Sequence, residues 1–218
     1  MVQLIISIGK NYRIYNIVKA GQRDIKFGCR LPHKNIIKYP IYFADQDWKN
    51  PNLPKYKKNI ERYKPEIATV LDYDENTTLD AVLFWAEEIS EFVNKIIIIP
   101  KVSNTIDSIP QTINTKQVVL GYSVPSNYGS TNVNIQEFYG RPTHLLGGSI
   151  RKQIQMLENH LHKCPIVSID NNYILFEANK FAKYWEYPTE KYPYGRSSHI
   201  DLLQNYTIPD EALSTNMI

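Results

Sequence analysis

The sequence predicts an α/β fold built on a parallel sheet, as a compact version of the (β/α)8 barrel of the TIM type. From residue 40 onward, short apolar runs rich in β-branched residues alternate with helical patterns. The runs are apolar on both faces, as in strands that are covered on both sides. Strand followed by helix, repeated, implies parallel strands joined by crossovers. An open doubly wound sheet shares this alternation and is the main alternative.

Regular spacing supports the barrel. The expected strand ends at 45, 72, 101, 121, 147 and 170 are 20–29 residues apart, which is close to the ~30 residues of a typical βα unit. The N-terminal region adds one or two strands, so the count approaches eight in a chain shorter than the usual ~250 residues. The expected strands are 4–9, 25–29, 41–45, 67–72, 96–101, 118–123, 144–148 and 166–170.

Four segments between or after these strands have helical patterns. Residues 54–64 open with Pro54, residues 77–93 begin at a capping Thr77 or Thr78, and residues 149–161 begin at Ser149. Residues 172–186 form the fourth expected helix. Periodicity is lost after it, so we expect one barrel domain over 1–186 and a Tyr- and Pro-rich tail over 187–218.

Composition sets broad limits on function. The chain of 218 residues is 43% hydrophobic and 22% charged, as expected of a globular protein, and no apolar run approaches the ~20 residues of a membrane span. The first apolar run is too short for a signal peptide, so we expect a cytoplasmic protein.

Cys29 and Cys164 are far apart and no CxxC or HExxH pattern occurs, so we expect neither a metal nor a cofactor. The net charge of +3 permits a polyanionic partner without requiring one.

Three aspartates, Asp45, Asp72 and Asp170, directly follow apolar runs. The carboxyl ends of parallel strands lie on one face, where active sites of α/β proteins are built. Carboxylates in one cleft can divide the work, one as nucleophile and another as proton carrier. The alternative for each is an N-cap of the following helix.

The segment LLGGSIRKQ predicts an anion site at a helix start. Free backbone N–H groups bind phosphate there, and glycine allows a close approach. The alternative is a tight βα turn that needs glycine for its backbone. The candidate phosphate-binding residues are Gly147, Gly148, Ser149, Arg151 and Lys152.

Lys101, and Gly121 with Tyr122, also stand at strand ends, and the Tyr122 ring is of a type that can stack on a flat base. Trp48, in the loop after Asp45, can contact a ring or can be the apolar plug of that loop. His144 is expected to be a core histidine with its side chain in or against the barrel.

Six segments taken in order resemble a compact phage and bacterial branch of the tRNA-guanine transglycosylase superfamily, which includes DpdA-type enzymes that place 7-deazaguanines in DNA. The similarity spans about residues 40–186. It rests on IYFADQDWKNP, IATVLDYD, IIIIPK, VVLGYSVP, THLLGGS and VSIDNNY.

The resemblance implies a role for each matching residue. Asp170 occupies the place of the aspartate that attacks C1′ of the target guanosine, and Asp45 that of the aspartate assisting proton transfer. Asp72 is similar to the aspartate that reads the guanine-like face of the base. Gly121 and Tyr122 match the segment lining the base pocket.

The chain also departs from the superfamily. The Asp-Ser-Gly-Gly-Phe signature is reduced to ADQDW, and Lys101 stands where a base-reading glutamine is expected. The zinc-binding cysteine cluster of the tRNA enzymes is absent from the sequence, which favours DNA over tRNA as substrate. The expected partners are therefore nucleic acid, with DNA favoured, and a 7-deazaguanine base. The alternatives are an accessory nucleic-acid-binding subunit that keeps the fold, and a small-molecule nucleoside transferase or sugar-phosphate enzyme.

Overall fold

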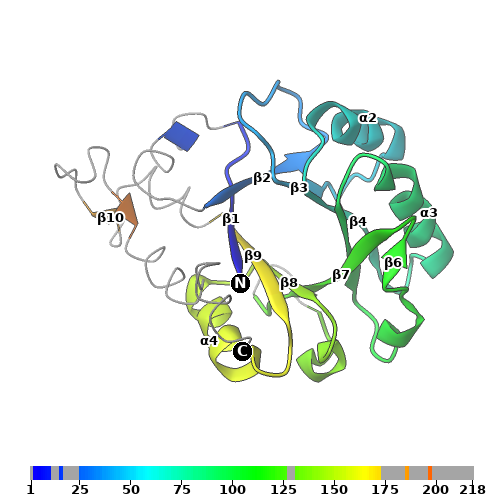
Figure 1. The fold of residues 1–218 in the computed structure, drawn as a ribbon, viewed down its shortest axis with the longest axis vertical. Helices are drawn as coiled ribbons and strands as arrows, with labels where there is room; N and C mark the ends of the chain where they lie inside the picture. Colours follow the sequence, from blue (N-terminus) through cyan, green and yellow to red (C-terminus); the bar gives the residue numbers. More distant parts are fainter. Residues whose placement is uncertain are drawn as a thin grey trace, which may run out of the picture.

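The computed structural model describes residues 2–10, 15–16, 25–126, 131–172, 185–186 and 196–197. Eight parallel strands close into a barrel, and the helices α2, α3 and α4 lie outside the ring of strands (Figure 1). This is the compact TIM-like barrel expected from the alternation of strands and helices.

The eight barrel strands coincide with the expected runs to within a few residues at each end. They are β1 (Gln3–Ser7), β2 (Lys26–Leu31), β3 (Phe43–Gln46), β4 (Ile67–Tyr73), β5 (Lys95–Pro100), β7 (Lys116–Ser123), β8 (Thr143–Leu146) and β9 (Ile166–Asn171). A short strand, β6 (Thr112–Ile113), pairs antiparallel with the start of β7.

One strand pairing separates the barrel from the open-sheet alternative. The sheet runs in the order β5-β4-β3-β2-β1-β9-β8-β7, and β5 also pairs in parallel with β7 through Lys95–Ile98 and Gln117–Leu120. This pairing joins the two ends of the sheet, so neither β5 nor β7 is left as an open edge.

Alternation along the strands divides the apolar residues into two cores. The larger one lies between the strands and their helices and includes Tyr56, Ile60 and Leu157. The smaller one fills the barrel interior with side chains from five strands: Ile5, Phe43, Ile67, Ile97, Ile99 and Val119. A filled interior leaves the carboxyl ends of the strands as the place for a site.

Local capping explains where the helices begin. In α2 (Leu53–Tyr63) the Asn52 side chain accepts from the Lys55 backbone N–H, and α3 (Leu79–Ser90) begins in the same way at Thr78. In α4 (Ile150–His160) Ser149 caps the backbone N–H of Lys152. Neither Asp45 nor Asp72 caps a helix, so the alternative interpretation of these two carboxylates as helix N-caps is wrong.

The fourth expected helix, 172–186, falls almost entirely outside the described residues. Trp185–Glu186 form β10, which pairs antiparallel with β11 (Arg196–Ser197). For these two residues the expectation of a helix is wrong. The expected division between a domain and a tail at residue 187 lies in the same undescribed part.

Two β-bulges turn aspartates toward the barrel interior. In β4 the register moves from Thr69↔Ile97 to Asp72↔Ile99, so three residues of β4 oppose two of β5. Because Ile97 and Ile99 both belong to the inner core, Asp72 also faces inward, whereas simple alternation from Ile67 would turn it outward. In β9 the register with β8 moves from Thr143↔Ile166 to His144↔Ser168, so β9 carries one extra residue at this point. This second bulge gives Asp170 its inward orientation.

Gly121 faces inward where the barrel is full. A Cβ there would approach Ile99 Cγ1 to 2.6 Å, Leu146 Cδ1 to 2.7 Å and Ile97 Cγ2 to 2.9 Å. We expect Gly121→Ala to lower the free energy of unfolding by about 1–3 kcal/mol through overpacking. Urea denaturation measures it, with Glu61→Ala on the exposed face of α2 as a control that changes it by less than about 0.5 kcal/mol. An unchanged value for Gly121→Ala would mean that the interior has room at this position.

Candidate functional site

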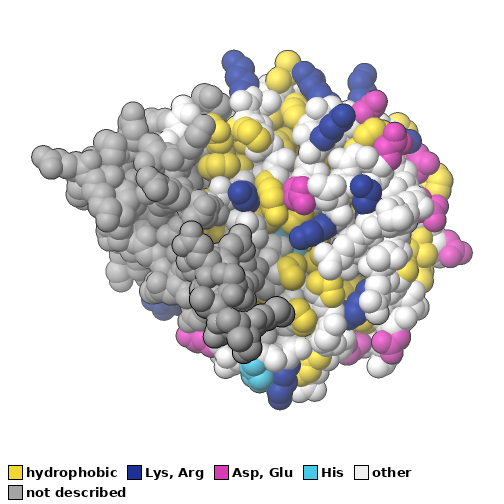
Figure 2. Space-filling model, in the orientation of Figure 1, with side chains coloured by type: hydrophobic (Ala, Val, Ile, Leu, Met, Phe, Trp, Pro, Cys, Tyr) yellow, Lys and Arg dark blue, Asp and Glu magenta, His cyan; other side chains and the backbone are white. Residues whose placement is uncertain are grey.

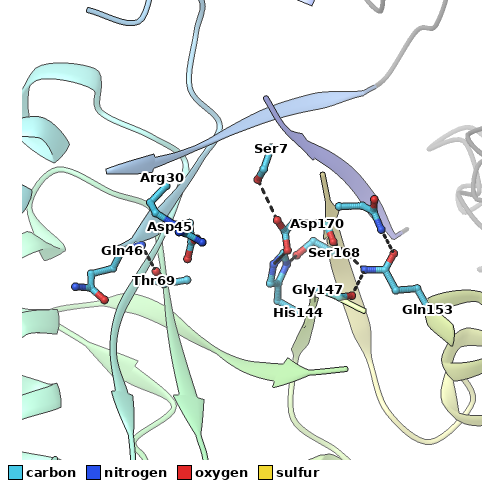
Figure 3. Close-up of polar contacts among 11 residues, drawn as sticks. Ser7, Arg30, Asp45, Gln46, Thr69, His144, Gly147, Gln153, Ser168 and Asp170 are labelled. Atoms are coloured by element: carbon cyan, nitrogen blue, oxygen red, sulfur yellow. Dashed lines mark hydrogen bonds and ion pairs between the residues drawn. The ribbon is translucent and has the colours of Figure 1, made fainter. Parts of the chain in front are cut away.

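The carboxyl ends of seven strands carry polar side chains, which together form the mouth of the barrel. In a barrel of parallel strands these ends lie on one face. Asp45 and Asp170, on β3 and β9, face the space enclosed by the strands (Figure 3). The polar residues of the mouth are Ser7, Arg30, Asp45, Asp72, Lys101, Ser123 and Asp170.

Each carboxylate oxygen of Asp170 faces a polar side chain. The Ser7 hydroxyl donates to Oδ2 at 3.0 Å, and Oδ1 lies 3.8 Å from Nε2 of His144. The Asp170 side chain is 15% exposed, whereas that of His144 is fully buried. The carboxylate therefore lies at the boundary between the packed interior and the open mouth.

Among the acids that the structure describes, Asp45 has the largest pKa shift toward neutral pH. Burial, together with the negative charges of Asp170 and, more weakly, Asp72, raises its pKa to about 7. Arg30 acts in the opposite direction through its charge and through an Nε–Oδ2 contact of 3.4 Å. A carboxyl with this pKa can both give and take a proton near neutral pH.

Asp72 and Lys101 form an ion pair at the carboxyl ends of neighbouring strands, with Nζ and Oδ2 3.8 Å apart. Lys101 also donates to the Ser123 hydroxyl. Burial raises the pKa of Asp72 and lowers that of Lys101, and in each case the partner's charge opposes the shift. The pair is therefore poorly solvated and places an acceptor and a donor side by side in the mouth.

The glycine turn lies beside Asp170. Gln153, fully buried in α4, donates through Nε2 to the carbonyl oxygens of both Gly147 and Asp170, each at 2.8 Å. Gly147 and Gly148 have φ of +62° and +72°, and a Cβ on Gly148 would meet Val124 Cγ1 at 2.5 Å. The turn thus requires glycine for its backbone and its packing, which is the structural alternative raised for this segment.

The anion-binding role of the turn stays a prediction. Ser149 is engaged as the cap of α4, and the Lys152 ammonium donates to the Pro125 carbonyl oxygen at 2.7 Å. Arg151 is exposed in the first turn of α4. The two glycines bring this helix start to the same mouth as Asp170.

The structure does not bring every predicted residue to the mouth. Tyr122 lies on the outer side of β7 in the larger core, where its ring packs edge-on against Phe138 with centroids 5.1 Å apart. Gly121 faces inward but lies one layer below the polar ring. Trp48 is not a plug, because it is 51% exposed, with Lys49 Nζ 5.1 Å from its ring centroid.

Sequence reasoning missed Ser7, Arg30 and Gln153, and it placed His144 only in the core. Gln153 shares the buried stripe of α4 with Ile150 and Leu157, so a polar residue on an apolar face was the available signal. Ser7 and Arg30 lie at the ends of the first two strands, where strand-end position was again the signal.

Charges on the face seen in Figure 2 are mixed. Lys and Arg side chains are scattered over its described part with acidic side chains among them, rather than gathered in one patch. Among the described residues, no group of three or more His, Cys, Asp or Glu is arranged to hold a metal ion. None of the described helices has the length and apolar character needed to span a bilayer.

A closed barrel of eight parallel strands with three carboxylates at one mouth has the architecture of the TIM-barrel class. The chain belongs to a family of unknown function (DUF6610), whose model matches residues 24–207. No curated protein and no solved structure gives a significant match.

The raised pKa of Asp45 makes stability depend on pH. Because the folded state binds this proton more tightly than the unfolded state, the free energy of unfolding falls as the pH rises from ~4, the ordinary aspartate value, to about 7. We expect Asp45→Asn to raise the free energy of unfolding by about 2–4 kcal/mol above pH 7 and by little below pH 4. Urea denaturation at pH 4 and pH 8 measures the difference. Equal effects at the two pH values would contradict the shift.

Proposed function

We propose that the protein is a base-exchanging transglycosylase that replaces guanine in nucleic acid, DNA in preference to tRNA, with a 7-deazaguanine. The observation that carries the proposal is the pairing of two aspartates at one mouth with different surroundings. Asp170 is oriented by Ser7 and His144, and Asp45 has a pKa of about 7. Displacement at an anomeric carbon with a covalent intermediate needs one carboxylate as nucleophile and another as acid and base.

In the first half of the reaction, the Asp170 carboxylate attacks C1′ of the target nucleotide. The C1′–N9 bond breaks and its electron pair leaves with guanine, which takes a proton from Asp45. An acid with a pKa near neutrality is protonated in a substantial fraction of molecules at pH 7, as this step requires. The sugar remains on Asp170 as an ester.

In the second half, N9 of the incoming 7-deazaguanine gives its proton to the Asp45 carboxylate and attacks C1′. The C1′–O bond to Asp170 breaks and the carboxylate is regenerated, so no further reactant is needed. The Asp72–Lys101 pair suits a guanine-like face, because Asp72 can accept from N1–H and N2–H while Lys101 donates to O6.

The target nucleotide has to leave the base stack to reach a barrel mouth. Arg151 in the first turn of α4 and the glycine turn are proposed to position the backbone at the side of Asp170. Arg30, which is 52% exposed, adds a guanidinium at the side of Asp45. We propose the cytoplasm as the place of this exchange, because nucleic acid substrate is present there.

Asp170→Asn tests the mechanism. Asparagine keeps the shape and still accepts from Ser7, but its amide does not form the glycosyl ester. Incorporation of radiolabelled guanine into DNA and tRNA, assayed in parallel, should fall by a factor of at least ~10³, because the covalent route is lost. Each tenfold loss of rate corresponds to ~1.4 kcal/mol of barrier. Wild-type protein stopped in mid-exchange should carry an oligonucleotide that survives a denaturing gel.

The matched control is Asp47→Asn, in the loop two residues after Asp45, which should leave exchange within about twofold. If Asp170→Asn keeps normal exchange while remaining folded, Asp170 is not the nucleophile. If wild-type protein exchanges neither substrate and forms no adduct, the proposed function is wrong.

Trp48 provides a test of nucleic-acid binding that needs no turnover. Its exposed ring is in the loop that follows β3, three residues after Asp45, and a base stacked on an aromatic ring contributes about 1–3 kcal/mol. We expect Trp48→Ala to weaken binding of a single-stranded oligonucleotide by about 10–100-fold, as measured by fluorescence anisotropy. Phe84→Ala is the control, because Phe84 is 54% exposed but lies on α3, outside the ring of strands. Equal effects of the two substitutions would contradict a role for Trp48.

A further inference from the structure

His144 is a fully buried imidazole beneath the mouth of the barrel. Its ring packs against Phe43 with centroids 5.0 Å apart. Nδ1 lies 2.7 Å from the Ser168 hydroxyl oxygen, and Nε2 faces Asp170 Oδ1 at 3.8 Å (Figure 3). Within the described part of the chain Nε2 has no hydrogen-bond partner, and it faces the Asp170 carboxylate.

The surroundings of this ring favour one of its two neutral tautomers. A neutral imidazole has one N–H and one lone pair. With the proton on Nδ1, the lone pair of Nε2 would point at the negative charge of Asp170, which is unfavourable. With the proton on Nε2, the N–H dipole points at Asp170, and the Ser168 hydroxyl donates to Nδ1. The second arrangement gives Nδ1 a donor and turns the Nε2–H toward a negative charge.

A serine, a histidine and an aspartate in contact resemble a hydrolase triad, but access rules this out. Ser168 is 1% exposed and His144 is 0% exposed, so no substrate reaches the hydroxyl. Of these three side chains, Asp170 is the one that reaches the mouth. The contacts therefore lead outward, from Ser168 through His144 to the carboxylate.

We propose that His144 is a positioning residue for Asp170: its Nε2–H, held in place by Ser168, supports Oδ1 while Ser7 holds Oδ2 at the mouth. The separation of 3.8 Å is longer than a hydrogen bond, and such contacts tighten in the reacting complex. The catalytic part of this inference rests on the proposed transglycosylase function, whereas the assignment of the tautomer does not.

The arrangement acts mainly on the second half of the reaction. When the incoming N9 attacks C1′, the C1′–Oδ2 bond breaks and its electron pair returns to the Asp170 carboxylate. An N–H directed at Oδ1 stabilises the returning charge, as donors placed where charge develops do in other enzymes. Loss of this donor is therefore expected to slow release of the sugar from Asp170 more than it weakens binding.

Two variants isolate the donor. His144→Phe keeps a ring against Phe43 and removes the N–H, whereas His144→Gln supplies an amide N–H in the place of Nε2. We expect His144→Phe to slow resolution of the covalent adduct by about 10–100-fold at unchanged KM, because it removes a donor to a charged group. His144→Gln should recover at least part of that rate. Adduct resolution at the wild-type rate in folded His144→Phe would overturn the proposal.

The tautomer is measured without any substrate. In ¹⁵N-histidine-labelled protein, the five histidines give separate long-range ¹H–¹⁵N correlations, and the signal missing from a His144 variant is assigned to His144. We expect a protonated Nε2 and an unprotonated Nδ1 at pH 8, and a shift of the Nε2–H proton signal in Asp170→Asn. Protonation on Nδ1, or no change in Asp170→Asn, overturns the inference even if exchange is observed. The expected tautomer in a protein that performs no exchange would overturn the proposed function and leave the tautomer assignment in place.

Discussion

Closure of the parallel sheet through the β5–β7 pairing is the constraint on which the rest of the structure depends. Once the sheet is closed, the barrel strands contribute alternate residues to a common interior, and all their carboxyl ends lie on one rim. The apolar layer of Ile5, Phe43 and Val119 fills the interior. Polar groups one step farther along the strands then have no place except the mouth, which is why residues distant in sequence share one site.

Burial of the charged groups of the mouth is unfavourable for folding. Burial acts against the charged forms of Asp45, Asp72 and Lys101, so each would be better solvated in the unfolded chain. The apolar cores inside the barrel and between the strands and the helices offset this cost. Groups with shifted pKa values that are kept in a cleft are common at functional sites, and this mouth gathers several of them.

Much of the fold was accessible from the sequence, because strands covered on both faces are apolar throughout and end at polar residues. The same reasoning located Asp45 and Asp170. It placed Asp72 correctly without the physical cause, since the bulge in β4 that turns this side chain inward has no signature in the sequence. Tyr122 was expected in the mouth, although alternation with Gly121 and Ser123 turns it outward. The position of His144 opposite Asp170 depends on the register between β8 and β9, which no local pattern specifies.

Gln153 makes the start of α4 and the end of β9 a single mechanical unit. Its amide group holds the carbonyl oxygens of Gly147 and Asp170 and accepts from Asn171 Nδ2 at 3.2 Å. Displacing the helix would break hydrogen bonds to buried groups, each of which costs about 1–3 kcal/mol to leave unsatisfied. A force applied to the first turn of α4 is therefore transmitted to the backbone of Asp170 and is not taken up by the glycine turn alone. Contact at the outer surface of this helix can in this way displace the residue that carries the carboxylate.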